Sequence, residues 1–285
     1  MLGSVADADD ALQEALLGAW RGYAGFEGRS SLRAWLYRIA TNACFQLLAQ
    51  RPQRRLATEY NAAAAPGGAL EPMVEGPVWL EPYPDDPEAS FEAREAVELA
   101  FVAALQHLPA TQRAALILRE VVGLSAAEVA EALDATVPSV ESALQRARRA
   151  VQERVPPLSQ QTTLRDLGET AQQAIVARFI DAWQSRNAEA LLALLSQDAK
   201  FSMPPIPSWF DGRDNVVRFF VERVFATPWR LQPLKASAQL AFACYQGPDF
   251  RLGALNVLTL RGGLIAETTG FLDPAVHVRF RLPER

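Results

Sequence analysis

Residues 61–90 most constrain how this chain can fold, because they carry six prolines and three glycines. Proline removes a backbone donor and clashes with the preceding helical turn, so a continuous helix cannot pass through them. They therefore predict an extended linker between folded parts. Within the linker, residues 78–84 are too apolar for a solvated tether. Trp79 and Tyr83 either cover the surface of a nearby domain or form a docking segment that fixes how two domains sit.

Charge is segregated along the chain, although the formal net charge is only -5. Residues 21–55 carry seven arginines and one acid, whereas residues 58–98 carry ten acids and one arginine. Residues 145–154 are basic again, with four arginines. The net charge argues against indiscriminate nucleic-acid binding, but two basic elements flank the acidic connection and remain available for specific contacts.

Composition excludes several classes of protein. The chain is 49% hydrophobic and 21% charged, which is typical of soluble globular proteins, and 285 residues suffice for one to three domains. It has no run of about 18 apolar residues, and its acidic N-terminus does not resemble a signal peptide, so we expect a cytoplasmic protein without a membrane span. Two cysteines and two histidines, scattered along the sequence, predict no disulfide framework, metal site or cofactor.

Helical periodicity dominates the first half. Apolar residues recur at helical spacing over 7–20, where Leu12, Leu16 and Trp20 are expected to face inward, and over 31–49. Two further helices are expected over 88–106 and 111–121. Ser125 and Glu128 form a capping box that opens a short helix, and Pro138 lies in the first turn of a longer one. This spacing is typical of a helix-turn-helix, although two short helices also occur in ordinary bundles.

The second half has a mixed pattern. After a second linker over 157–168, helices are expected over 169–185, 188–195 and 213–224. Strand-like runs cover 199–203, 234–246, 250–261 and 264–272, and the last two are joined by the hairpin signal Arg-Gly-Gly at 261–263. Helices followed by an antiparallel sheet predict an α+β domain.

With these motifs in place, the first half resembles the extracytoplasmic-function sigma factors of bacterial RNA polymerase. Residues 7–14 read Asp-Ala-Asp-Asp-Ala-Leu-Gln-Glu, and residues 35–42, preceded by Phe26, read Trp-Leu-Tyr-Arg-Ile-Ala-Thr-Asn. Residues 108–113, 123–130 and 146–148 carry the family's Leu-Pro-x-x-Gln-Arg, Gly-Leu-Ser-x-x-Glu-Val-Ala and Arg-Ala-Arg patterns. The resemblance implies an all-α sigma region 2 over 1–57, a linker over 58–90 and an all-α helix-turn-helix region 4 over 91–156.

The resemblance also implies partners and contact residues. Core RNA polymerase would bind the acidic helix through Asp7, Asp10, Leu12, Gln13 and Glu14. Promoter DNA would be contacted by Arg29, Arg38, Asn42, Ser139, Glu141, Ser142, Gln145, Arg146 and Arg149, whose amides, hydroxyls and charges suit bases and phosphates. Trp35 is expected to pack in the core. The family begins with further helices before its acidic block, so we expect region 2 to be N-terminally incomplete in the chain as given.

The second half resembles the cone-shaped nuclear-transport-factor-like fold of SnoaL-like domains and polyketide cyclases. Phe-x-Met-Pro-Pro at 201–205 and Trp-Phe-x-Gly-Arg-Asp at 209–214 carry the likeness, which implies a regulatory domain over 169–285. In relatives this extension is thought to control the sigma domains in place of a separate anti-sigma factor. A set of four residues either lines a small-molecule pocket or belongs to a hydrophobic core: Met203, Trp209, Phe210 and Tyr245. Glu267 and Asp273 are isolated, so no catalytic residue is assigned.

The leading hypothesis is a bacterial transcription initiation factor with a fused regulatory domain, which binds rather than catalyses. The rival hypothesis is an enzyme, an isomerase or hydrolase of the cone fold that the helical half delivers to DNA. An ordinary one-component repressor would need a dimerisation helix, and the acidic helix argues against it.

Overall fold

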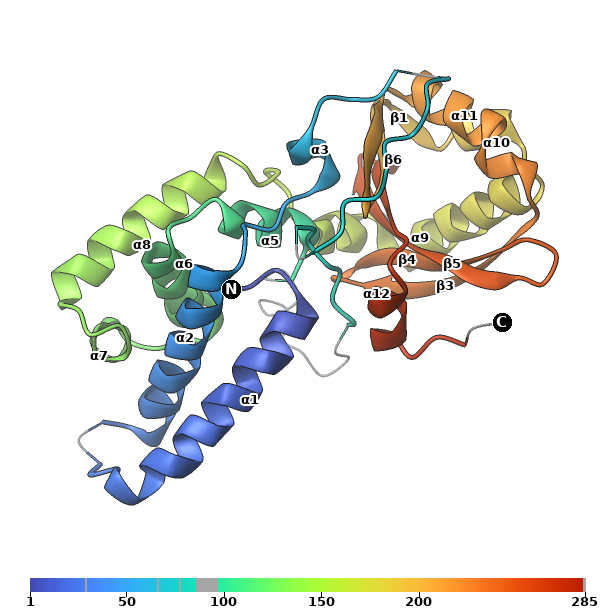
Figure 1. Ribbon diagram of the computed structural model, residues 1–285. Helices are drawn as coiled ribbons and strands as arrows, with labels where there is room; N and C mark the ends of the chain where they lie inside the picture. The colour runs from blue at the N-terminus through green and yellow to red at the C-terminus, as the bar shows by residue number, and fades with distance from the viewer. Residues whose placement is uncertain (29, 66, 77, 86–96, 284–285) are drawn as a thin grey trace. The chain divides into compact units, whose positions relative to one another are not determined.

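The computed structural model describes residues 1–28, 30–65, 67–76, 78–85 and 97–283 (Figure 1). The chain forms two compact units. One combines Met1–Arg54 with Ser90–Pro157 and is called the helical unit here; the other combines Arg55–Ala89 with Leu158–Arg285 and is called the cone unit. Arg29 and the part of the predicted 88–106 helix before residue 97 lie outside the described residues.

The helical unit contains the helices that the sequence predicts. They are α1 (Val5–Gly22), the 3-10 turn η1 (Tyr23–Gly25), α2 (Leu32–Gln50), α5 (Leu99–Gln106), α6 (Ala110–Leu116), the π-helical turn η2 (Ile117–Val121), α7 (Ala126–Ala132) and α8 (Val137–Gln152). The capping box at the start of α7 is confirmed, since the Ser125 side chain accepts from the Glu128 backbone and the Glu128 side chain accepts from the Ser125 backbone. Thr136 caps α8, and Pro138 lies in its first turn.

Helix α1 packs on α2 through small residues rather than through its leucines. Ala11 and Ala15 are buried, and a Cβ atom added at Gly18 would lie 3.1 Å from the side chain of Ile39. The predicted inward face is therefore wrong: Leu12 is 55% exposed and Trp20 is 84% exposed. Small side chains let the two helix axes approach closely, which turns the bulky residues outward.

The remaining helices of this unit enclose two small hydrophobic clusters. Leu124, Val129 and Val140 join α7 to α8, and Leu105, Leu116 and Leu144 join α5 and α6 to α8. The buried positions of α8 recur every three or four residues, so the opposite face of the helix is left at the surface.

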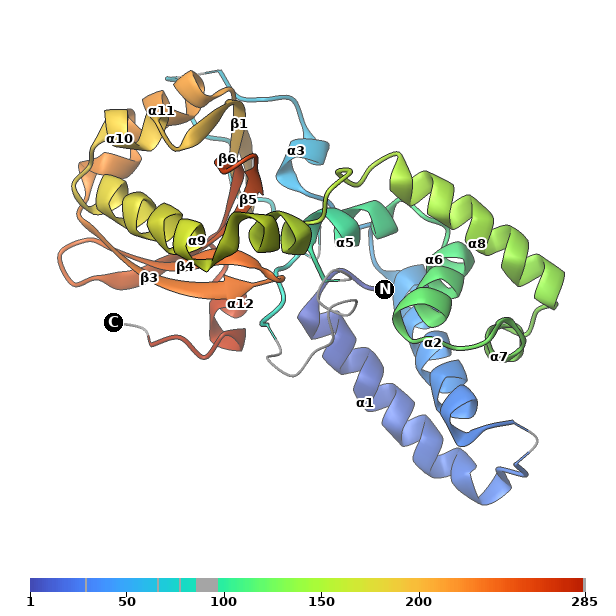
Figure 2. The same cartoon turned by 180° about the vertical axis from the view of Figure 1, so that it is seen from behind.

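The cone unit is built on one six-stranded sheet with helices beside it (Figures 1 and 2). Its elements are α3 (Ala57–Tyr60), α9 (Gln160–Gln184), α10 (Ala188–Leu192), β1 (Leu195–Met203), β2 (Ile206–Asp211), α11 (Arg213–Glu222), η3 (Val224–Ala226), β3 (Trp229–Ala236), β4 (Gln239–Gln246), β5 (Arg251–Arg261), β6 (Leu264–Phe271) and α12 (Pro274–Arg279). The strand order is β2-β1-β6-β5-β4-β3, with only the β1–β6 pair parallel among the described strands.

Three expectations for this half are corrected. Residues 157–168, predicted to be a linker, instead hold the first part of α9, which begins at Gln160 and kinks at Gly168 (φ 73°, ψ 163°). The predicted 234–246 strand is two strands, because Ser237 and Ala238 adopt positive φ values of 53° and 57° and form a tight turn. Strand β2 was not predicted, although its residues are buried without interruption from Pro207 to Phe210.

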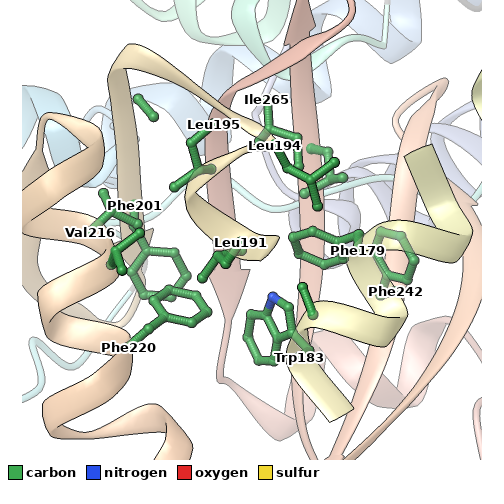
Figure 3. Packing of buried hydrophobic residues seen from close by; sticks show 14 of the residues in the cluster. Phe179, Trp183, Leu191, Leu194, Leu195, Phe201, Val216, Phe220, Phe242 and Ile265 are labelled. Carbon is green, nitrogen blue, oxygen red and sulfur yellow. The ribbon is translucent and has the colours of Figure 1, made fainter. Parts of the chain in front are cut away.

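Aromatic side chains fill the space between the sheet and its helices (Figure 3). Phe179 and Trp183 of α9 meet Phe242 of β4 and Phe220 of α11, with ring centroids 4.7 Å apart for Phe179–Phe242 and 4.8 Å apart for Trp183–Phe220. Such aromatic contacts add to the free energy gained by burying the rings. The interior of the cone is therefore a packed core.

Candidate nucleic-acid interface

The outward face of α8 carries polar and charged side chains at every turn. All six predicted contact residues on this helix are exposed: Ser139, Glu141, Ser142, Gln145, Arg146 and Arg149. The buried face of α8 holds the helix against α6 and α7, and Arg148 is fixed by an ion pair with Glu120. A helix presented in this way offers donors, an acceptor and cations to a groove of DNA.

Helix α2 presents a second polar face. Arg38 and Asn42 are both exposed and lie one turn apart on α2. Trp35, expected in the core, is half-buried, and its ring centroid lies 5.0 Å from that of Phe26. The structure thus leaves Arg38 and Asn42 accessible, while Trp35 packs on the turn before the helix.

The acidic helix α1 divides its predicted contact residues into two groups. Asp10, Leu12, Gln13 and Glu14 lie at the surface. Asp7 is only 2% exposed, and its carboxylate accepts hydrogen bonds from Arg54 Nε at 3.0 Å and Arg54 Nη2 at 2.6 Å and also pairs with Arg51. Asp7 therefore joins α1 to the end of α2 and is not accessible to a partner, in contrast to the expectation.

Contacts that the sequence did not predict join the two halves of the helical unit. The Arg33 guanidinium donates to the Val122 carbonyl, the Gln53 amide donates to the Gln106 carbonyl at 2.9 Å, and Tyr37 packs on the α7–α8 cluster. Arg113 is buried and donates to the backbone carbonyls of Met1, Gln106 and Leu108. Burial lowers the pKa of Arg113 to about 10, so the residue stays charged at neutral pH.

Residues 55–85 are called the strap here, and those of them that the structure describes pack on the cone unit instead of forming a free linker. The Arg55 amide donates to the Val78 carbonyl at 2.8 Å, and the Leu80 amide donates to the Arg55 carbonyl at 3.1 Å. Between these points the strap follows the edge strand β2, where the Ala64 amide donates to the Trp209 carbonyl at 2.7 Å and the Val74 amide to the Pro205 carbonyl at 2.9 Å. The strap thus covers an otherwise open sheet edge.

Trp79 and Tyr83 lie within this strap. Trp79 is 7% exposed, its ring lies 5.0 Å from that of Tyr60, and its indole donates to the Val74 carbonyl at 3.1 Å. Tyr83 exchanges two hydrogen bonds with Ser237 in the β3–β4 turn: its amide donates to Ser237 Oγ at 3.0 Å, and its carbonyl accepts from the Ser237 amide at 2.8 Å. Tyr83 therefore binds the cone directly, whereas Trp79 is buried against Tyr60 and Val74 of the strap itself.

The four residues expected to line a pocket are not brought together. Met203 and Phe210 belong to the aromatic core, whereas Trp209 is directed to the opposite face of β2, where its indole donates to the Asn61 carbonyl of the strap at 2.9 Å. Neighbouring residues of a strand point to opposite faces, so Trp209 and Phe210 cannot line one cavity. The ring of Tyr245 lies under the Arg230 guanidinium, 5.2 Å from ring centroid to Cζ.

Asp273 and Glu267, the two isolated acids of the cone, interact with neighbouring protein groups. Asp273 caps α12 by accepting from the Ala275 amide at 2.8 Å. Glu267 lies opposite Lys200 in the β1–β6 pair, and Thr269 donates to its carboxylate at 3.4 Å. Burial raises the pKa of Glu267, and the nearby charge of Lys200 opposes that shift. Each of the two acids thus has its own structural partner.

No group of three or more potential ligands among His, Cys, Asp and Glu is positioned to hold a metal ion within the residues that the structure describes. None of the described helices combines the length and the apolar character needed to cross a bilayer.

Comparison with known proteins agrees with this arrangement of elements. Residues 1–54 match the family described as Sigma-70 region 2, residues 98–151 match Sigma-70, region 4, and residues 176–268 match the SnoaL-like domain. Sigma regions 2 and 4 followed by a SnoaL-like domain define the class of protein. It is a sigma-70-type factor of RNA polymerase with a C-terminal extension.

The relatives narrow the class. The chain is 40% identical over 296 residues to the ECF RNA polymerase sigma factor SigG of Mycobacterium tuberculosis, covering 100% of this chain and 79% of that protein. It is 33% identical over 156 residues to the ECF RNA polymerase sigma-E factor of Escherichia coli strain K12, covering 53% of this chain and 75% of that protein. The chain belongs to the extracytoplasmic-function (ECF) sigma factor family, and it is a non-enzymatic transcription initiation factor.

A solved structure supports the fold. The crystal structure of the extracytoplasmic function sigma factor SigJ of Mycobacterium tuberculosis superposes on this chain with a TM-score of 0.60 and 20% sequence identity. The match covers 99% of this chain and 93% of the SigJ chain. Helical sigma regions 2 and 4 followed by a mixed α+β domain are therefore shared between the two chains.

Proposed function

We propose that this sigma factor acts with core RNA polymerase in the cytoplasm and reads promoters through the exposed faces of α2 and α8. We further propose that its cone unit regulates initiation by holding the strap that connects region 2 to region 4. The observation that carries this proposal is the set of hydrogen bonds that Ala64, Val74 and Tyr83 of the strap make with the cone.

Polymerase and promoter contacts follow from which side chains are accessible. Asp10, Leu12, Gln13 and Glu14 form an acidic and apolar face on α1, which suits a basic protein surface. On α8, Gln145 and Glu141 can read base edges, while Arg146 and Arg149 can contact phosphates. Arg29 is proposed as a further DNA contact from the resemblance alone.

The α8 proposal predicts two different outcomes for two substitutions. Arg149→Ala should weaken binding to all duplexes alike and reduce the dependence of log affinity on log salt by about one unit, because one phosphate contact is lost. Gln145→Ala should relax preference at one promoter position, with about 1–3 kcal/mol of discrimination lost. Binding of the full chain to a promoter duplex and its single-position variants, at several salt concentrations, measures both. Identical effects of both substitutions on every duplex would contradict specific readout.

Regulation by the strap is supported by the point at which the chain passes from the helical unit to the cone unit. Arg54 is buried in the helical unit with Asp7, and the next residue, Arg55, already pairs with Val78 in the cone unit. No spacer therefore separates region 2 from the strap. While the strap stays on the cone, the chain that leaves region 2 at Arg54 is held, and we infer that this restricts region 2.

Release of the strap should raise transcription. Trp79→Ala removes a buried indole, which typically costs about 3–5 kcal/mol, so the released state should become at least a hundredfold more populated. We expect several-fold more run-off transcript from a cognate promoter with core polymerase, together with faster amide exchange across residues 55–85. Met73→Ala is the matched control, because Met73 lies in the strap but is 59% exposed. Faster exchange without increased transcription would contradict the regulatory proposal.

A further inference from the structure

A groove of about 680 Å³ lies between α9 and the β3–β4 hairpin, at the margin of the packed core of the cone. One wall is formed by Val176 and Ile180 of α9, and the other by Leu234 and Leu240 of the hairpin. Figure 2 shows α9 running beside these strands. Ligand pockets are typically about 300–1,000 Å³ and mostly apolar with a few polar groups, so the groove has the size of a small-molecule site.

The kink of α9 explains why the groove exists. Before Gly168, the helix is fastened to the sheet because the Gln160 side chain donates to the Leu260 carbonyl at 3.0 Å and accepts from the Leu260 amide at 2.7 Å. After Gly168, the helix buries Ile175 and Phe179 in the core. The next face of the helix, with Val176 and Ile180, is left partly uncovered above the edge strand β3.

The polar groups at the rim determine which head group fits. Lys235 is the cation of the lining, is exposed, and forms no ion pair with any residue that the structure describes. The carboxylate of Glu169 already accepts from Gln173 at 3.3 Å. An unpaired ammonium group beside an apolar wall is complementary to an anion that carries a hydrocarbon body.

We propose that this groove binds an amphipathic small molecule, with its hydrocarbon body along Val176, Ile180 and Leu240 and its anionic head group at Lys235. The site differs from the cone interior, which aromatic side chains occupy (Figure 3). It also contains none of the four residues for which a pocket was expected from the sequence.

The groove lies next to the β3–β4 turn, which binds the strap at Tyr83 and Asp85. Lys235 and Leu240 flank the β3–β4 turn, in which Ser237 binds Tyr83 and the Ala238 amide donates to Asp85 Oδ1 at 2.7 Å. A ligand that moves either lining residue therefore acts on the turn that holds the strap. This coupling rests on the proposed regulatory function, whereas the binding site itself does not.

Binding is tested on the full chain with dodecanoate as the probe, by titration calorimetry below its micelle concentration. Dodecylamine and dodecanol are matched probes with a cationic and a neutral head group. We expect dodecanoate to bind at one site and Lys235→Gln to weaken it about fivefold to tenfold, because one charge-assisted contact is lost. Absence of saturable dodecanoate binding, or preferential binding of dodecylamine that Glu169→Gln abolishes, would overturn the proposal.

A blocking variant locates the site. Ala177 lies on the groove side of α9 and is exposed, so Ala177→Phe fills the groove without entering the core and should weaken dodecanoate binding about tenfold or more. Ala174→Phe adds the same ring at an exposed position of α9 outside the lining and should bind like the parent chain. Equal affinity of the two phenylalanine variants, with both melting like the parent, would contradict the location.

The coupling to the strap has its own readout. Dodecanoate should change run-off transcription by the parent chain and by Ala174→Phe, but not by Ala177→Phe. If Ala177→Phe abolishes binding while dodecanoate leaves transcription unchanged in every variant, the site stands and the coupling is wrong. If Trp79→Ala also fails to alter transcription, the regulatory function of the strap fails independently of the site.

Discussion

Asp7→Ala is expected to lower the free energy of unfolding of the helical unit by about 3–5 kcal/mol, because it leaves the guanidinium of Arg54 buried without its counter-charge. Arg54 is 5% exposed and donates two hydrogen bonds to the Asp7 carboxylate. Loss of that carboxylate should separate the start of α1 from the end of α2. Amide exchange across both helices, measured in the full chain, should accelerate by two orders of magnitude or more.

Asp10→Ala is the matched control for Asp7→Ala. Asp10 lies one turn further along α1 and also pairs with Arg51, at 3.3 Å, but it is exposed. An exposed ion pair contributes about 0–1 kcal/mol, so stability should hardly change. If Asp10 contacts polymerase as proposed, its substitution should instead weaken core binding in a pull-down at matched salt. Comparable destabilisation by both substitutions would contradict the structural role assigned to Asp7.

The reversed face of α1 shows what a sequence can and cannot predict about a helix. Its existence follows from periodicity and from Ser4 at the N-cap. Its orientation depends on which stripe a neighbouring helix can approach, and Ala11, Ala15 and Gly18 permit a closer approach than the leucines do. Their spacing of four and three residues was present in the sequence, but hydrophobicity alone favoured the bulkier stripe.

The cone illustrates the same limit for strands. Its class and the β5–β6 hairpin were predictable, because alternating apolar residues flank Gly262 and Gly263. The β3–β4 turn at Ser237 and Ala238 was not, because neither residue type favours positive φ by itself. Hydrogen bonds to Tyr83 and Asp85, more than 150 positions earlier in the sequence, surround this turn. Local backbone propensity gives no information about hydrogen bonds from residues so distant in the sequence.

The residues of the candidate site were predictable where a sequence motif determines both the start of a helix and which of its side chains are exposed. The capping box and Pro138 position α8, so its outward residues could be named from the sequence. The contacts of the strap with β2 could not, since they are largely made by backbone groups, as between Ala64 and Trp209. Backbone hydrogen bonds carry almost no sequence signature.

Phe210→Ala is expected to destabilise the cone unit by about 3–5 kcal/mol, because it opens a cavity in a packed aromatic core. Phe210 is buried, and its ring stacks on Phe219 with centroids 4.3 Å apart. A residue that lined an open ligand pocket would cost much less to truncate, since its environment would already contain solvent. Urea unfolding followed by tryptophan fluorescence reports on the cone through Trp183, Trp209 and Trp229.

Val221→Ala supplies the comparison for Phe210→Ala, because Val221 lies on α11 beside Phe219 and Phe220 but is largely exposed. Its truncation should change the midpoint of unfolding only slightly, since surface substitutions usually stay within about 0.5 kcal/mol. Addition of dodecanoate should raise the stability of the parent chain and of Phe210→Ala by similar amounts, because Phe210 does not line the groove. If Phe210→Ala is tolerated as well as Val221→Ala, the interior is a solvated cavity and the assignment of Phe210 to the core is wrong.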